Sequence, residues 1–425
     1  MNPVSRLALA PVILLLWLSP ALSAPATAPA ALGADLAGLI EHARRSNPEL
    51  QRRQLEAEAL RERVDSAAAL PDPRFQLELM DFTNAMSGGS TSLLPGEVGQ
   101  TRYRVTQPLP FWGKRALRGG IAEAEADVAD ANRRQTQIDL ERRIKVAFAG
   151  HYQATHQQKI LRETLDLVVG FERLVLTRYS VGLVPQQDAL RAQTEMTRLK
   201  IELLDAEARH AAAAAQLLAL LALEPDTALA DPITLPARPQ PPTHGELLRR
   251  ARSSAPELQV EAGQIAAAEQ ARDLAYRERY PDFAVGLTNN RPRTGEDSWD
   301  LMLEVQIPLQ QGRRRSQERE AEHRREAALA RLRARDASLA GRLGETRAAY
   351  LAELGRAELL GGTLLPQAKA NLDAAVADYE TGRIDFGTLI EAETQILETR
   401  LRLLDANVAA AQRLAELEML VGAEL

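Results

Sequence analysis

The chain contains one long segment twice, with the two copies 200 residues apart. The first copy begins at Tyr179 with Tyr-Ser-Val-Gly-Leu, and the second begins at Tyr379 with Tyr-Glu-Thr-Gly-Arg. Both run without a gap into Leu-Leu-Asp-Ala, which ends at Ala206 and Ala406. An offset held over this length indicates an internal duplication. The 425-residue chain is therefore expected to consist of two similar halves.

Each copy predicts a tight turn followed by a long returning helix. Gly182 and Gly382 can adopt the positive φ that ends a helix. After each turn, apolar and small residues recur at alternating spacings of four and three, which is typical of a coiled-coil seam. The seam positions of the first copy are Leu190, Thr194, Thr197, Ile201, Leu204, Ala208, Ala211, Ala215 and Leu218. Those of the second are Ile390, Thr394, Leu397, Leu401, Leu404, Val408, Ala411 and Ala415.

Composition favours long helices over a large compact core, because the chain is rich in Ala, Leu, Glu and Arg and only 4% aromatic. The net charge of −6 comes from dispersed charges of both signs, which argues against a nucleic-acid partner. The chain has no cysteine, so it forms no disulfide and carries no lipidated N-terminal cysteine.

Residues 1–23 have the pattern of a secretory signal peptide. Arg6 supplies the positive end, the apolar stretch runs from Leu7 to Leu18, and small residues at 21–23 form a cleavage site. The alternative is a retained anchor, although the apolar run is short for a spanning helix. An exported chain without cysteine fits a bacterial periplasm or outer membrane. No later segment offers 18 consecutive apolar residues, so a membrane crossing would have to use strands.

The two halves share one plan, separated by a proline-rich linker at 224–243. Each is expected to hold helices, a β-hairpin and a long helical hairpin, with Pro366 kinking the second long helix. In the first repeat, 24–223, the hairpins are 73–109 and 113–222, and in the second, 244–425, they are 281–309 and 313–422.

The four predicted strands alternate apolar and polar residues over roughly ten positions, which suits transmembrane barrel strands. Phe75, Leu77 and Leu79, for example, alternate with Gln76 and Glu78. The alternative is a half-buried soluble sheet, which needs an apolar surface to cover one face. The apolar seams of the helices are expected to pack against one another and so do not provide that surface. Four strands cannot close a barrel. Two chains would give eight strands around a filled interior, and three would give twelve around a water-filled lumen.

These features together resemble the TolC-type outer membrane factors over essentially the whole mature chain. The resemblance is carried by the duplication and the two Tyr-x-x-Gly turns. It is also carried by the paired openings Asn47-Pro48-Glu49-Leu50 and Ala255-Pro256-Glu257-Leu258, and by Gln107-Pro108-Leu109-Pro110 before Gly113-Lys114-Arg115. The last signature resembles the heavy-metal-efflux branch, which includes cobalt–zinc–cadmium and copper–silver systems.

The resemblance implies a mainly α fold with a small β part, built from duplicated long helical hairpins and four transmembrane strands. It implies a homotrimer with a twelve-stranded β-barrel in outer membrane lipid and a periplasmic α-helical tunnel. The implied function is the passive exit duct of a tripartite efflux system. The partners would be a periplasmic adaptor protein and, through it, an inner-membrane pump.

The same resemblance assigns candidate site residues. The turns become the periplasmic tips, where Val181, Gly182 and Leu183 match the family's adaptor-contact motif and the second tip offers Gly382 and Arg383. The competing interpretation is that the glycines only end helices. The family's acidic aperture positions are Thr388 and Glu391 here, and Asp385 is a further candidate; the competing interpretation is a solvated helix face.

Nothing in the sequence indicates catalysis, since no nucleophile–base arrangement is visible, and neither an enzyme nor a cofactor is predicted. His151 and His156 are five residues apart and lack a Glu-x-x-His context, so no metal site is predicted. The alternative function is a periplasmic adaptor or coiled-coil scaffold without a channel. An adaptor would carry one helical hairpin between β-rich halves, whereas this chain has two hairpins and no such halves.

Overall fold

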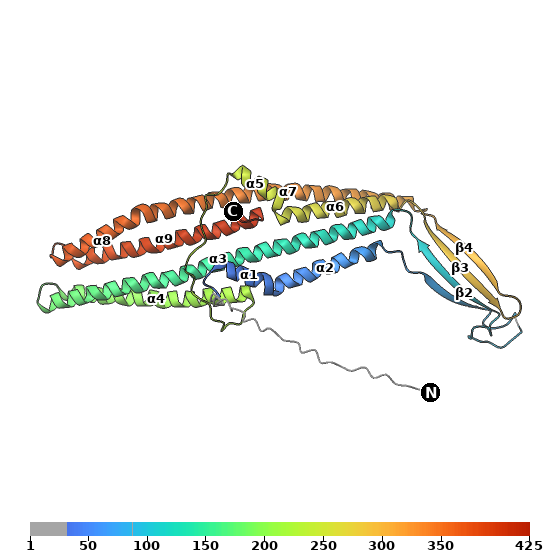
Figure 1. Ribbon diagram of the computed structural model, residues 1–425, viewed down its shortest axis with the longest axis horizontal. Coiled ribbons are helices and arrows are strands. Elements are labelled where there is room, and N and C mark those ends of the chain that lie inside the picture. The colour runs from blue at the N-terminus through green and yellow to red at the C-terminus, as the bar shows by residue number, and fades with distance from the viewer. Residues whose placement is uncertain (1–31, 87) are drawn as a thin grey trace, which may run out of the picture.

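The computed structural model describes residues 32–86 and 88–425 and shows a long, narrow molecule (Figure 1). The signal peptide expected at 1–23 lies outside these residues. The strands lie at one end, and two helical hairpins form the other. The helices are α1 (Leu36–Ser46), α2 (Pro48–Ala68), α3 (Lys114–Ser180), α4 (Gln186–Leu221), α5 (His244–Ser254), α6 (Pro256–Arg277), α7 (Gln311–Leu359), α8 (Leu365–Glu380) and α9 (Phe386–Val421).

Both halves run through two shorter helices, a pair of strands, a long helical stretch, a turn and a returning helix. Pro48 and Pro256 occupy the first turns of α2 and α6. Backbone N–H groups in a first turn have no hydrogen-bond partner within the helix, so proline costs no helical bond there. The Asn47 side chain accepts a hydrogen bond from Glu49 N at 2.8 Å. Ala255, at the matched place in the second half, has no side chain able to do so.

The second long helix is interrupted near Pro366, where the sequence predicts a kink. A π-helical turn, Leu360–Leu364, separates α7 from α8, and Pro366 is the second residue of α8. Gly312 lies 67 residues before Tyr379, whereas Gly113 lies 66 before Tyr179, so the second half has one extra residue. A π turn accommodates a single inserted residue within a helix. The two tips can therefore lie level although the helices differ in length.

The four strands form one antiparallel sheet in the order β1 (Arg74–Met80), β2 (Gln100–Leu109), β3 (Asp282–Pro292) and β4 (Ser298–Gln306). The register aligns many apolar residues on one face of the sheet, although Gln107 lies opposite Val285 and Asn289 opposite Trp299. The apolar face includes the rows Phe75–Val105–Leu287–Leu301, Val285–Leu303 and Phe283–Val305. The opposite face is polar and hydrogen-bonded: Arg102 Nε donates to Asn290 Oδ1 at 2.8 Å, and Asn290 Nδ2 donates to Asp300 Oδ2 at 2.6 Å.

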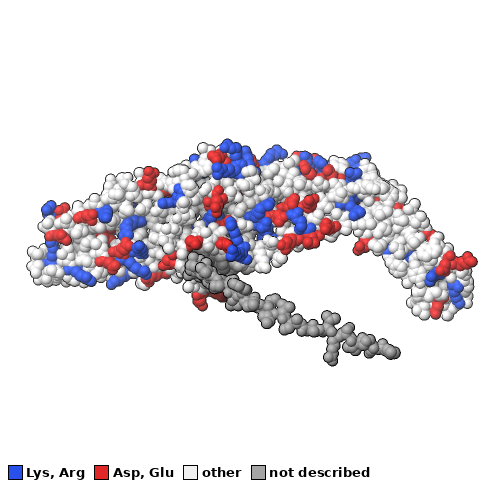
Figure 2. Space-filling view, viewed as in Figure 1, with Lys and Arg blue, Asp and Glu red and all other residues white. Residues whose placement is uncertain are grey.

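The apolar face of the sheet is uncovered in the single chain, where Leu303 is 74% exposed and Trp299 66% exposed. Figure 2 shows charged side chains of both signs dispersed over the helices and few over the strands. Within the described residues, no helix combines the length and apolarity that a bilayer crossing requires. In the described chain β1 and β4 each pair on one side only, so the outer edges of both present unpaired backbone groups.

The coiled-coil seam predicted for the second copy is confirmed inside the chain. Leu397, Leu404 and Val408 are buried because α9 lies between α3 and the helices α7 and α8. The corresponding prediction for the first copy is wrong as an intrachain seam. Ile201 is 56% and Leu204 65% exposed, because α4 packs mainly against α3. Along most of α4 the buried apolar residues lie on a different face of the helix: Ala189, Ala192, Leu199 and Ala206. Of the predicted seam positions only Leu218, near the end of the helix, is buried.

Arginine substitutions on the two faces of β4 should have unequal effects. Leu303→Arg places a charge on the apolar face, and if that face meets lipid, as the strand pattern predicts, it should destabilise the protein in a bilayer by about 2–4 kcal/mol. Glu304→Arg, one residue away on the polar face, should have a much smaller effect. The measurement is the free energy of unfolding in urea from lipid vesicles. Equal losses for both variants would contradict a lipid-facing apolar surface.

Candidate functional site

The two tips lie at the end of the molecule opposite the sheet (Figure 1) and have the same backbone geometry. Gly182 and Gly382 both have a φ of +74°. In the first turn Leu183 N donates to Arg178 O at 3.0 Å, and in the second Arg383 N donates to Asp378 O at 2.9 Å. These are the bonds of a glycine-ended helix, so both glycines do end helices.

The side chains of the two tips differ in chemistry although their backbones match. At the first tip Val181 is 66% and Leu183 71% exposed, and a Cβ added at Gly182 would meet no atom within 4 Å. At the second tip the Arg383 guanidinium lies 3.1 Å from the Asp378 carboxylate. The first tip therefore presents an apolar surface and the second an ion pair.

Arg178 ties the two tips together, and it was not among the residues predicted from the sequence. Its Nη1 donates to Tyr379 O at 2.6 Å, and its Nη2 donates to Glu380 O. The guanidinium also lies 5.1 Å from the centre of the Tyr379 ring. The matched position of the second copy is Asp378. The opposite charges of Arg178 and Asp378 at one repeat position were the feature of the sequence that could have pointed to Arg178.

The two candidate aperture residues occupy different environments at the start of α9. The Asp385 carboxylate accepts hydrogen bonds from Thr388 N at 2.8 Å and from the Thr388 hydroxyl at 3.2 Å. These bonds hold the pKa of Asp385 below its usual value, so it stays ionised while it caps the helix. Glu391 lies farther along α9 and is exposed.

A third acid on α9, Glu393, is fully buried where α9 approaches α4, and sequence reasoning missed it. Among the described residues, neither of its carboxylate oxygens has a hydrogen bond of ordinary geometry. Burial raises its pKa to about 7, and Glu195 and Glu202 of α4 act in the same direction. Arg198 of α4 and the adjacent Thr394 oppose the shift. Glu393 is thus partly protonated at neutral pH.

Replacing Glu393 with glutamine should stabilise the protein only at higher pH. Below the usual glutamate pKa of 4.5, the carboxyl is protonated in both the folded and unfolded states, so the substitution changes little. As the pH rises from about 4.5 to about 7, wild type loses roughly 3 kcal/mol per chain that Glu393→Gln retains. Thermal unfolding followed by circular dichroism between pH 4 and 8 measures this.

The matched control is Glu398→Gln, because Glu398 is exposed on the same helix and paired with Arg402 at 3.0 Å. That variant should show no stabilisation at high pH. A gain from Glu393→Gln that is equally large at pH 4 and pH 8 would show that the carboxyl does not titrate as described.

The histidines singled out in the sequence do not come together. His156 stacks on Tyr152 with ring centres 3.8 Å apart, as neighbours on one helix do. His151 instead meets His210 and Asp231, with one potential ligand atom from each lying within 4.8 Å of the others. Within the described residues this is the one group whose side chains are spaced to hold a metal ion.

Known proteins resemble this chain over most of its length. The family model described as outer membrane efflux protein matches residues 39–223 and 247–423. The cobalt-zinc-cadmium resistance protein CzcC of Cupriavidus metallidurans is 23% identical over 373 residues, which cover 84% of this chain and 83% of CzcC.

Solved structures give the same result for the fold. The outer-membrane channel OprN matches with a TM-score of 0.78 at 20% identity, over 91% of this chain and 90% of its own. CusC, whose structures concern transmembrane channel formation, matches with a TM-score of 0.78 at 17% identity, over 91% of this chain and 92% of its own. The chain therefore belongs to the outer membrane efflux protein family and has the mainly helical fold of its channels.

Proposed function

We propose that three copies of this chain form an outer membrane exit duct that passes divalent metal ions outward from a periplasmic adaptor and an inner-membrane pump. The observation that carries this proposal is the incompleteness of the single chain. The exposed apolar stripe of α4, formed by Leu190, Ile201 and Leu204, has no partner within the described residues. The two outer strand edges, on β1 and β4, have none there either. Further copies supply both partners at once.

Three copies suit the sheet better than two. Each chain brings four strands, and the polar face of the sheet carries Arg102, Glu78 and Asp300. An eight-stranded barrel has an interior filled by side chains, where such charges would be desolvated. A twelve-stranded barrel leaves room for water around them. The apolar face then contacts lipid, and the helices continue the lumen into the periplasm.

Metal ions are the proposed cargo because of the relationship to CzcC. The name of that protein specifies resistance to cobalt, zinc and cadmium, and the similarity extends over most of both chains. The structural match to CusC supports the fold of the duct and leaves its cargo to experiment.

The adaptor is proposed to dock on the first tip. Val181 and Leu183 are exposed apolar side chains beside a glycine that leaves the backbone accessible, a combination that suits an apolar partner surface. At the second tip Gly382 repeats the backbone shape, and Arg383 adds a charged contact beside Asp378. Arg178 holds the two tips in a fixed relation, so one adaptor can contact both.

Leu183→Asp should abolish transport without unfolding the protein. The side chain is 71% exposed, so its replacement removes no internal packing, yet a charge at the centre of the docking surface should weaken adaptor binding at least about tenfold. Binding is measured with the purified adaptor, and transport as tolerance to zinc, cobalt and cadmium in cells carrying the pump and adaptor.

Ile233→Asp is the matched control, because Ile233 is 72% exposed but lies in the linker, away from the tips. It should bind the adaptor and support tolerance like wild type. Full metal tolerance with Leu183→Asp would contradict the tip assignment. Wild-type protein that protects cells from organic toxicants but not from metals would contradict the metal cargo and leave the duct intact.

The aperture is proposed to be ringed by Glu391, one from each chain, with Asp385 nearby as the cap of α9. Three exposed carboxylates around a narrow lumen attract multivalent cations. Glu391→Gln should therefore raise the concentration of a trivalent cation that half-blocks single-channel current, by at least about tenfold. Glu398→Gln, whose charge is compensated by Arg402, should leave the block unchanged. Unaltered block in Glu391→Gln would remove Glu391 from the aperture.

A further inference from the structure

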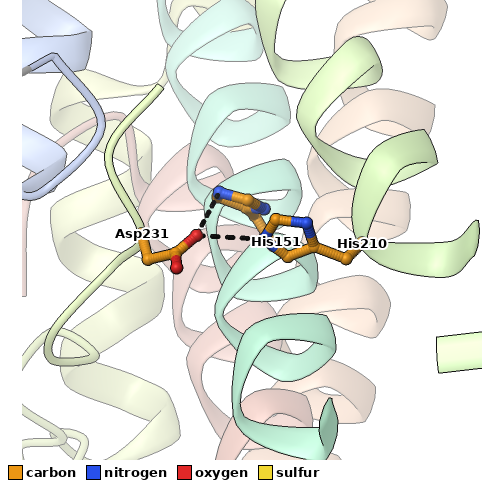
Figure 3. A group of neighbouring side chains, drawn as sticks. All are labelled: His151, His210 and Asp231. Carbon is orange, nitrogen blue, oxygen red and sulfur yellow. Dashed lines mark hydrogen bonds and ion pairs between the residues drawn. The ribbon is translucent and has the colours of Figure 1, made fainter. Parts of the chain in front are cut away.

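Three polar side chains from distant parts of the chain converge on one another (Figure 3). His151 comes from α3, His210 from α4, and Asp231 from the linker at 224–243 that joins the two halves. Asp231 Oδ1 lies 3.0 Å from His210 Nε2 and 4.0 Å from His151 Nε2. The two imidazole rings are 4.8 Å apart between centres.

The state of His151 is the unusual part of this cluster. Its side chain is 1% exposed, and neither ring nitrogen has a hydrogen-bond partner among the described residues. Buried polar atoms in native proteins are almost always bonded to protein, water or an ion. The imidazole must nevertheless bond to something, because leaving it unpaired would destabilise the fold.

In the second half, the residue that matches His151 has a hydrogen-bond partner. Gly312 lies 199 residues after Gly113, so the position matched to His151, before the extra residue of the π turn, is Tyr350. Tyr350 is also fully buried, and its hydroxyl donates to Pro239 O of the same linker at 2.8 Å. Both long helices therefore use this position to face the linker. In the second half the contact is made directly, whereas in the first half an imidazole and a carboxylate stand 4.0 Å apart.

We propose that His151, His210 and Asp231 bind a divalent first-row transition-metal ion of the zinc type. Two imidazole nitrogens and one carboxylate oxygen are ligands that such ions prefer over calcium or magnesium. A fourth position is left for water, as in open zinc sites. The ion satisfies His151 and joins the linker to α3 and α4. The sequence prediction of no metal site rested on spacing along one helix, which misses ligands from three segments.

The geometry requires only a small closure around the ion. Zinc–ligand bonds of about 2.0–2.2 Å in a tetrahedron place the ligand atoms roughly 3.4 Å apart. The ligand atoms present lie within 4.8 Å of one another, and the two histidines are held on packed helices. Asp231 and His210 supply the movement, because their side chains are 62% and 29% exposed, and His210 must turn toward His151 since the wider gap lies between the two imidazoles. The same exposure gives the ion a route from solvent.

Electrostatics prepares the site for a cation. Burial, followed by the neighbouring His210, lowers the pKa of His151, so its imidazole is neutral at physiological pH, the form that coordinates metal. Among the described residues His151 has no outer hydrogen-bond partner to support its coordinating nitrogen, so affinity should be below that of closed structural zinc sites.

The bound ion is proposed to be a structural part of the protein and not transported cargo. This inference therefore holds whatever the duct carries. The linker crosses between the halves at the level where α3 and α4 meet it, and an ion there fastens the linker to the first half. Zinc should therefore raise the thermal stability of the assembled protein at this joint.

The test uses untagged, full-length protein purified in detergent, stripped with a chelator and dialysed against Zn²⁺. Metal analysis should find about one zinc per chain, and cobalt in its place should give the visible absorption of tetrahedral Co²⁺. His210→Gln and Asp231→Asn, both at partly exposed positions, should each weaken zinc binding at least about tenfold and remove the zinc-dependent stabilisation. His156→Gln, on the same helix as His151, is the matched control and should bind zinc like wild type.

Two outcomes would overturn the proposal. One is that wild-type protein binds no zinc in the dialysis. The other is that zinc binding survives unchanged in the His210→Gln, Asp231→Asn double variant, which would place the ion elsewhere. Because these readouts measure binding and not efflux, they stand apart from any failure of the metal-duct proposal.

Discussion

The uncovered apolar stripe along α4 is the constraint on which the rest of the structure depends. Leu190, Ile201 and Leu204 repeat with coiled-coil spacing yet remain more than half exposed, because α4 packs mainly on α3. Burying side chains of this kind is worth about 1.5–3 kcal/mol each, so the stripe favours a helix from another chain. The sheet makes the same demand through its unpaired edges and its uncovered apolar face. The helical end and the strand end thus each lack a partner within the described chain, and the proposed trimer would supply both.

The duplication supplies two identical frameworks and lets their chemistry diverge. Gly182 and Gly382 have the same φ, yet one turn exposes apolar side chains and the other an ion pair. Arg178 has become the bridge between the tips, while its counterpart Asp378 pairs within its own turn. The residues facing the linker have diverged as well, into a histidine in one half and a tyrosine in the other. The backbone is thus conserved between the halves where shape matters, and side chains differ where each half meets something different.

Features set by local periodicity could be predicted from the sequence, and features set by distant contacts could not. Period-two alternation assigned Phe75 and Leu301 to the apolar face correctly, because a strand has only two faces. Both turns could be predicted from their glycines, because few other residues adopt a positive φ. The apolar spacing along α4 is present, but its expected packing within the chain is wrong, because periodicity does not say whether the partner helix lies in the same chain. Glu393 and the histidine cluster escaped prediction because their environments are created by segments far apart in the sequence, and no spacing along one helix signals them.

The most direct test of this account is the accessibility of the α4 stripe in native membranes. Because the chain has no cysteine, Ile201→Cys introduces a single thiol at the centre of the stripe. The account predicts that a membrane-impermeant maleimide added to opened outer membrane vesicles labels this thiol far more slowly than a thiol at Leu183 of the free tip. It also predicts that the difference disappears once the assembly is dissociated. Equally rapid labelling of both thiols in the intact membrane would show that α4 has no partner and that the single chain is complete by itself.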